Sequence, residues 1–171
     1  MDTTSPHPAA RSPGQLFDAC EVRFLRRSGP GGQRCNKTET AVLLYHRPTG
    51  VTAEANERRS QAENREVALF RLRVNLALGV RCPDAADRPP SPLWKSRSRG
   101  GRIDVSSSHA DFPALLAEAL DRVAGCGADV KTAAQELRCT ASQLVKLLKK
   151  EPRAMALVNA WRQERNLHPL R

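Results

Sequence analysis

Aromatic residues are scarce in this chain, at 4% of the sequence, so any hydrophobic core has to be built from aliphatic side chains. No hydrophobic run is long enough to span a membrane. The opening stretch, MDTTSPHPAARSPGQ, has no apolar segment of the kind found in a secretory signal. We therefore expect a cytoplasmic protein without a membrane partner, and the Pro, Ser and Thr content predicts a disordered N-terminus over residues 1–15.

Disulfide and metal-binding patterns are missing too. The five cysteines are odd in number and form no C-x-x-C pair, which argues against a disulfide framework and against a zinc ribbon. The four histidines are scattered along the chain. We expect free thiols in a reducing compartment, no metal and no cofactor.

Acidic residues are outnumbered, and the formal net charge is +10 with a pI of about 10.1. Residues 1–109 carry 18 Lys and Arg against 11 Asp and Glu, and residues 110–171 carry 10 against 7. Such a balance indicates a polyanionic partner, most often nucleic acid, and the first part of the chain should supply most of the contact. Charge that serves solubility alone is the alternative.

The hydrophobic pattern predicts an α+β domain over residues 16–81. Alternation over 20–28 indicates a strand, and 40–56 reads as a hairpin that turns at Arg47-Pro48-Thr49-Gly50. Ser60-Gln61-Ala62-Glu63 is a capping box that opens a helix, which should end at Gly79. We expect a small antiparallel sheet covered by this one helix.

Two further regions follow. Residues 82–109 are rich in Pro and Ser and then in cations, which predicts a flexible linker. Residues 110–171 change to a period of 3.6 and predict a small all-α unit that folds on its own. Two of its short helices, joined near Arg138, resemble a helix-turn-helix, although many small helical bundles share this pattern.

The segment RRSGPGGQRCNK, residues 26–37, combines a bare glycine loop with many cations. Gly31 and Gly32 allow positive φ and a close approach of the backbone, and Gln33 does not titrate at ordinary pH. The usual serine-hydrolase, zinc-protease and P-loop motifs are absent. A loop with donors and no base suits chemistry that orients water and stabilises an oxyanion through backbone N–H groups. A flexible hairpin tip without chemistry is the alternative reading of the glycines alone.

The longer string from Ser28 to Leu72 resembles the catalytic domain of class I peptide-chain release factors. Gly31-Gly32-Gln33 corresponds to their GGQ motif, and four further segments follow in the family's order. These segments are Asn36-Lys37-Thr38-Glu39, Pro48-Thr49-Gly50, Arg59-Ser60-Gln61 and Asn64-Arg65. The resemblance covers residues 20–78.

The resemblance implies a site and partners. Gly31, Gly32 and Gln33 would promote hydrolysis of the peptidyl-tRNA ester in the large ribosomal subunit, and Gln33 would be a candidate for side-chain methylation. Gln33 would act mainly through its backbone N–H, while its side chain admits and selects water. The cations around this motif and in the linker would contact rRNA and tRNA phosphates. They are Arg26, Arg27, Arg34, Lys37, Arg58, Arg59, Arg65, Lys95, Arg97, Arg99 and Arg102.

Release factors that read stop codons carry a large codon-recognition region, and residues before 16 are too few to hold one. We therefore expect a codon-independent ribosome-rescue peptidyl-tRNA hydrolase that acts as a monomer. In such proteins a basic tail occupies the empty mRNA channel, and the cations from Lys95 to Arg102 would begin it. The helical unit that follows departs from that pattern and leaves the role of the tail open.

Two other functions remain open at this point. One is a ribosome- or RNA-binding module whose GGQ loop no longer catalyses. The other is a nucleic-acid-binding regulator that uses the helices near residues 130–150. In that reading Gln143, Lys146, Lys149 and Lys150 would face the nucleic acid, although a solvated helix face explains them equally well.

Overall fold

The structure is a computed structural model that describes residues 6–25, 40–82 and 88–171. Its elements in chain order are η1 (Pro8–Ala10), α1 (Pro13–Asp18), β1 (Cys20–Leu25), β2 (Ala41–His46), β3 (Thr52–Ala55), α2 (Gln61–Gly79), α3 (Pro92–Arg97), β4 (Ser98–Arg99), β5 (Arg102–Ile103), α4 (Phe112–Gly125), α5 (Val130–Glu136), α6 (Ala141–Leu148) and α7 (Pro152–Glu164). The predicted α+β class, with a small antiparallel sheet and several helices, is confirmed for these residues.

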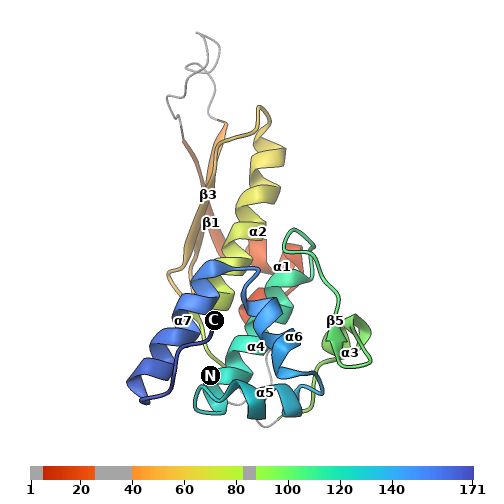
Figure 1. Ribbon diagram of the computed structural model, residues 1–171. Coiled ribbons are helices and arrows are strands. Elements are labelled where there is room, and N and C mark those ends of the chain that lie inside the picture. Colours follow the sequence, from red (N-terminus) through yellow and green to blue (C-terminus); the bar gives the residue numbers. More distant parts are fainter. Residues whose placement is uncertain (1–5, 26–39, 83–87) are drawn as a thin grey trace.

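The three-stranded antiparallel sheet has the order β1-β2-β3. The predicted turn between β2 and β3 is confirmed, because Gly50 donates its N–H to the His46 carbonyl at 2.8 Å with a φ of +71°. A positive φ there favours glycine over residues with a Cβ. The sheet and α2 form the upper part of the molecule in Figure 1.

Helix α2 lies along one face of the sheet and packs on β2 and β3. Leu72 and Leu76 recur four residues apart and are fully buried, as the hydrophobic spacing predicts. The helix begins at the predicted position, but the Ser60 side chain makes no capping hydrogen bond. Because α2 packs mainly on β2 and β3, Phe24 of β1 is 47% exposed rather than buried with Cys20.

The N-terminal segment differs from the disordered lead-in that its composition predicts. Among the described residues, 6–15 include η1 and the start of α1, and Ala9 is fully buried. Arg73 of α2 explains this, since its guanidinium donates to the Ala9 carbonyl at 3.0 Å and to the Ala110 carbonyl at 2.6 Å. One side chain thus ties η1, α2 and the start of α4 together.

The expected flexible linker also differs from the structure in its described part, residues 88–109. This stretch forms α3 and the two-stranded β4–β5 hairpin. Trp94 is 1% exposed, and its indole N–H donates to the Leu137 carbonyl at 2.9 Å. The buried indole gives a Pro- and Ser-rich segment the apolar contact that its composition alone does not suggest.

Helices α4 to α7 form the lower part of the molecule in Figure 1. Two of these helices begin at a side-chain cap of the usual kind: Asp129 accepts from the Lys131 N–H at 2.9 Å, and Thr140 accepts from the Gln143 N–H at 3.2 Å. These helices do not stand apart from the sheet. Helix α4 packs on α2 and η1, and one cluster of buried residues runs from Leu44 and Leu72 to Leu120.

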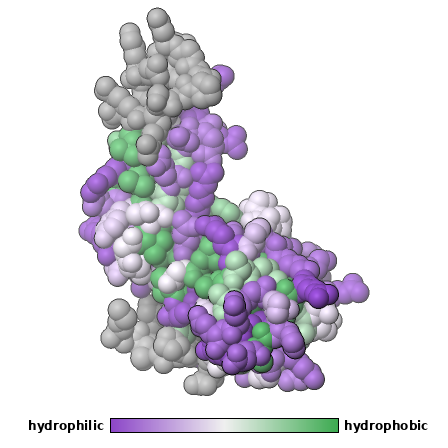
Figure 2. Space-filling model, turned by 60° about the vertical axis from the view of Figure 1, so that its left-hand side comes forward, coloured by the Kyte–Doolittle hydropathy of each residue, from purple (hydrophilic) through white to green (hydrophobic). Residues whose placement is uncertain are grey.

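Hydrophilic residues cover most of the face seen in Figure 2, and hydrophobic ones gather below the grey segment at its top. Among the described helices, none combines the length and the apolar character that crossing a membrane requires.

Candidate functional site

The predicted catalytic residues Gly31, Gly32 and Gln33 lie outside the described residues, as do Arg26, Arg27, Arg34 and Lys37. Their roles therefore stay predictions. The structure does describe the two points at which the chain enters and leaves segment 26–39. Leu25 at the end of β1 pairs with Ala41 at the start of β2, so both ends of the segment are held side by side on the sheet.

Asn64 fixes the chain directly after that segment. It is fully buried near the start of α2, and its side-chain amide donates to the Thr40 carbonyl at 2.7 Å and to the Arg58 carbonyl at 2.9 Å. Its side-chain oxygen accepts the Arg58 N–H at 2.9 Å. The amide thus joins three parts of the chain: the entry to β2, the loop after β3 and α2.

Sequence patterns assign Asn64 no role beyond its place in the order of the family's segments. The available signal was its position, because Asn64, Ala68 and Leu72 lie four residues apart on the buried stripe of α2. A polar side chain on such a stripe has to find partners inside the protein. Neutral Asn suits this place, since it offers donors to two carbonyls and an acceptor to one N–H.

Three of the predicted RNA-binding cations are near neighbours of Asn64 in the sequence, and we call Asn64 with its hydrogen bonds to Thr40 and Arg58 the clamp. Arg58 and Arg59 are exposed in the loop between β3 and α2, at the end of the sheet that leads to segment 26–39. Arg65 is also exposed, and its guanidinium carbon lies 5.2 Å from the centre of the Phe17 ring. The structure thus brings Arg58 and Arg59 to the base of the GGQ segment, whereas the Arg65 guanidinium turns toward α1.

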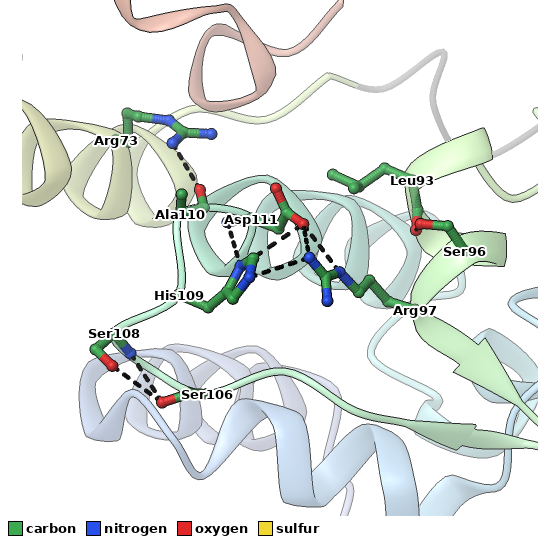
Figure 3. A network of polar contacts seen from close by, with 9 residues as sticks. All are labelled: Arg73, Leu93, Ser96, Arg97, Ser106, Ser108, His109, Ala110 and Asp111. Carbon is green, nitrogen blue, oxygen red and sulfur yellow. Dashed lines mark hydrogen bonds and ion pairs between the residues drawn. The ribbon is translucent and has the colours of Figure 1, made fainter.

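The other four predicted cations lie elsewhere, on α3 and the β4–β5 hairpin at the lower right of Figure 1. Arg97 is neutralised, because its Nη2 and Nε donate to Asp111 Oδ2 at 2.6 and 2.9 Å, with His109 beside them (Figure 3). Lys95, Arg99 and Arg102 are exposed and have no ion pair with another described residue. The seven predicted cations that the structure describes therefore do not form one surface.

The described residues hold one cluster of possible metal ligands, formed by His7, Cys82 and Asp121. Both ring nitrogens of His7 are already engaged: Nε2 lies 3.1 Å from the Val80 carbonyl, and Nδ1 accepts the Ala9 N–H at 3.0 Å. Asp121 accepts from Arg81 Nη1 at 3.0 Å and from the Cys82 N–H at 3.2 Å. Hydrogen bonds and a neighbouring guanidinium cation make this a structural junction rather than a metal site.

Burial governs the charge states at this junction. It lowers the pKa of His7 from 6.5 to about 4, an effect that the nearby Arg81 cation increases and the bond to Val80 opposes. Burial also raises the pKa of Asp121 to about 6, although the Arg81 cation acts in the opposite direction. A neutral His7 agrees with the geometry, since its Nδ1 serves as an acceptor.

The site is thus a small antiparallel sheet whose first two strands hold a GGQ-containing segment, with a helix and cations around its base. Residues 17–100 match the family model described as the RF-1 domain. This part of the chain belongs to the class I peptide chain release factor family, and the resemblance stated from the sequence is confirmed.

Curated relatives agree with this assignment. The chain is 38% identical over 85 residues to peptide chain release factor 2 of Frankia casuarinae, covering 50% of this chain and 21% of that protein. It is 42% identical over 78 residues to peptide chain release factor 1 of Kineococcus radiotolerans, covering 46% and 21%. Peptide chain release factor 1 of Ureaplasma parvum is 55% identical over 63 residues, covering 36% and 18%. The chain spans about a fifth of the length of these relatives, and no solved structure matches it.

Proposed function

We propose that this protein hydrolyses the ester bond of peptidyl-tRNA on the ribosome and so releases the nascent peptide. The observation that carries the proposal is the triplet Gly31-Gly32-Gln33 within an RF-1 domain, in the segment that joins β1 to β2. The relatives named peptide chain release factor support the same activity.

The chemistry needs no titrating side chain. Water attacks the ester carbon and gives up a proton, and the bond from that carbon to the ribose oxygen of the tRNA breaks as the ribose oxygen takes up a proton. The negative charge that develops meanwhile on the carbonyl oxygen is stabilised by the backbone N–H of Gln33. The Gln33 side chain selects and admits the water, and Gly31 and Gly32 let the backbone come close to the ester. In this mechanism the sheet and Asn64 act as a rigid base that fixes where the segment begins and ends.

Contact with the large subunit runs through the cations near this base. Arg58 and Arg59 are exposed in the loop beside the strand ends that carry the segment, and Arg65 is exposed further along, beside α1. Their charges suit rRNA and tRNA phosphates. Arg26, Arg27, Arg34 and Lys37 add to this contact from the segment itself. The protein binds the ribosome as a monomer and uses no cofactor or metal.

We further propose that release does not depend on a stop codon, as in ribosome rescue. The support is the cationic stretch from Lys95 to Arg102 and the helical layer after it, which offer contacts to RNA that require no particular codon. The described residues after the RF-1 match form α4 to α7 around the same core as α2.

The test measures peptide release from purified ribosomes that carry labelled peptidyl-tRNA. Three complexes are compared: one with a stop codon in the decoding site, one with a sense codon there, and one whose mRNA ends before that site. Equal or faster release without a stop codon supports the rescue function. Release only with a stop codon contradicts the codon-independent proposal and leaves the hydrolase. No release from any complex contradicts both and favours a non-catalytic ribosome- or RNA-binding module.

A further inference from the structure

A groove of about 830 Å³ separates the β4–β5 hairpin from α6. Two contacts hold its walls together: the Thr140 N–H donates to the Gly101 carbonyl at 3.3 Å, and Lys150 Nζ donates to the Val105 carbonyl. The lining includes two arginines of the hairpin and two polar residues one turn apart on α6. The lining residues that matter here are Ser96, Arg99, Arg102, Asp104, Gln143 and Lys146.

The charges of this groove lack compensation. Arg99, Arg102 and Lys146 are exposed and have no ion pair with another described residue. Arg97 also reaches the groove, but its charge is neutralised by Asp111 (Figure 3). Three uncompensated cations therefore face one carboxylate, that of Asp104.

The hairpin register makes this arrangement costly for the fold. Arg99 and Arg102 are direct partners across the β4–β5 pair. Like charges at directly opposite positions destabilise an antiparallel pair. A local rule that is broken without an internal compensation is typical of a functional site.

The lining also indicates the chemistry of the ligand. Its one hydrophobic side chain is Ile103, and it has no aromatic ring among the described residues, so it offers neither the apolar centre of a protein interface nor a stacking platform for bases. Cations suit phosphates, and the Gln143 amide suits ribose hydroxyls. Ser96 Oγ donates to the Leu93 carbonyl at 2.7 Å and is left as an acceptor for a ribose hydroxyl.

We propose that this groove binds the sugar–phosphate backbone of RNA, as a second contact at the end of the molecule away from the GGQ segment. The strands that enter segment 26–39 rise at the top of Figure 1, whereas β5 and α6 lie at its lower right. The inference rests on the proposed function for the identity of the RNA as ribosomal. Its test measures binding without peptide release, so the two proposals can fail separately.

The test compares two full-length triple variants that lose the same charge. The groove variant carries Arg99→Gln, Arg102→Gln and Lys146→Gln. The control variant carries Lys131→Gln, Arg165→Gln and Arg171→Gln, at exposed positions outside the groove. Affinity for a short single-stranded oligoribonucleotide is measured over a salt series, with an oligodeoxynucleotide of the same sequence and polyglutamate as competitors.

We expect the groove variant to bind at least about tenfold more weakly at 0.1 M salt, and the slope of log affinity against log salt to fall by about 2, since each lost phosphate contact removes about 0.7. The control variant should change the slope by much less. Equal losses in the two variants overturn the proposal, and so does displacement by polyglutamate with no preference for RNA.

A single substitution tests the same groove in the opposite direction. The Asp104 carboxylate has no hydrogen bond from another described residue, and only its backbone N–H is engaged, with the Arg97 carbonyl at 3.0 Å. Asp104→Asn removes a repulsive charge and keeps the shape, so it should strengthen RNA binding several-fold at low salt. Unchanged or weaker binding by this folded variant counts against the groove as the RNA contact.

Discussion

Asn64 holds the chain directly after segment 26–39, which carries the GGQ motif. Its buried amide bonds to Thr40 at one side and to Arg58 at the other, so the entry to β2 cannot shift without breaking hydrogen bonds inside the protein. Asn and Asp differ here, because a carboxylate would face the two carbonyls without a donor. In the proposed function, Asn64 affects hydrolysis indirectly, because it holds the backbone next to segment 26–39.

Replacing this clamp should separate catalysis from binding. Asn64→Ala leaves two carbonyls and one N–H without partners, which should cost about 2–4 kcal/mol of unfolding free energy. In the variant that remains folded, the kcat of peptide release should fall by about tenfold or more through misplacement of the GGQ segment. The apparent KM for ribosomes should change less than kcat, because the variant keeps every cation, although the Arg58 backbone loses its two hydrogen bonds to Asn64.

Asn75→Ala is the matched control on the same helix. Its amide donates to the Thr52 carbonyl at 2.8 Å in an exposed place, away from segment 26–39. It should leave the kcat of release near the wild-type value. Equal kcat values for the two variants, measured below their melting temperatures, would refute the positioning role of Asn64.

Helices η1, α2 and α4 meet at a junction that the sequence does not reveal. His7 contacts Val80 after α2, and Arg81 pairs with Asp121 of α4 at 3.0 Å between Nη1 and Oδ1. The Arg81 guanidinium carbon also lies 5.8 Å from the centre of the Trp161 ring of α7. Three sequence-distant segments are therefore held by polar contacts in a mostly buried place.

This junction predicts a pH dependence of stability. Because burial lowers the pKa of His7 to about 4, the unfolded chain takes up a proton below pH 6.5 that the folded chain refuses. Folding therefore loses stability as the pH falls from 6.5 to 4, by up to about 1.4 kcal/mol per unit. The raised pKa of Asp121 acts in the opposite sense between about 6 and 3.8, so the two contributions partly cancel in the wild type.

His7→Gln exposes this compensation. The variant should be less stable at pH 7, where packing is lost, and should gain on the wild type as the pH falls to about 4.5, when unfolding free energies are measured by denaturant titration. His168→Gln removes an exposed imidazole and is the control. A His7→Gln curve that runs parallel to the wild type from pH 7 to 4.5 would show that the junction does not suppress protonation.

Hydrophobic periodicity and turn residues in the sequence predicted most of the helices and strands around the candidate site. The β2–β3 hairpin with its Gly50 turn, the start of α2 and the caps of α5 and α6 all follow from local residues. Composition failed where a single side chain decides: Ala9 and Trp94 anchor segments that their Pro and Ser content marks as disordered or flexible. Long-range hydrogen bonds, such as that from Trp94 to Leu137, leave no periodic signal in the sequence.

The whole molecule places two cationic regions far apart on one core. The exposed Arg58 and Arg59 lie near the strands that carry the GGQ segment, and the groove of Arg99 and Arg102 lies beside α6. The sequence suggested a helical unit that folds on its own behind a flexible linker. In the structure the buried core is instead continuous from the sheet through α2 to α4. A rigid connection would let contact at one end fix the position of the other.

The central claim, that the GGQ segment hydrolyses peptidyl-tRNA, is tested by the rate of peptide release from saturated ribosomes by the wild type, Gln33→Ala and Gly32→Ala. Gln33→Ala keeps the backbone N–H, so release should fall but persist. Gly32→Ala adds a Cβ where the backbone turns or approaches the ester, and strain of about 1–3 kcal/mol should slow release more, by about 5- to 150-fold. Ribosome binding should stay near the wild-type value in both variants, whereas full peptide release by Gly32→Ala would contradict the account.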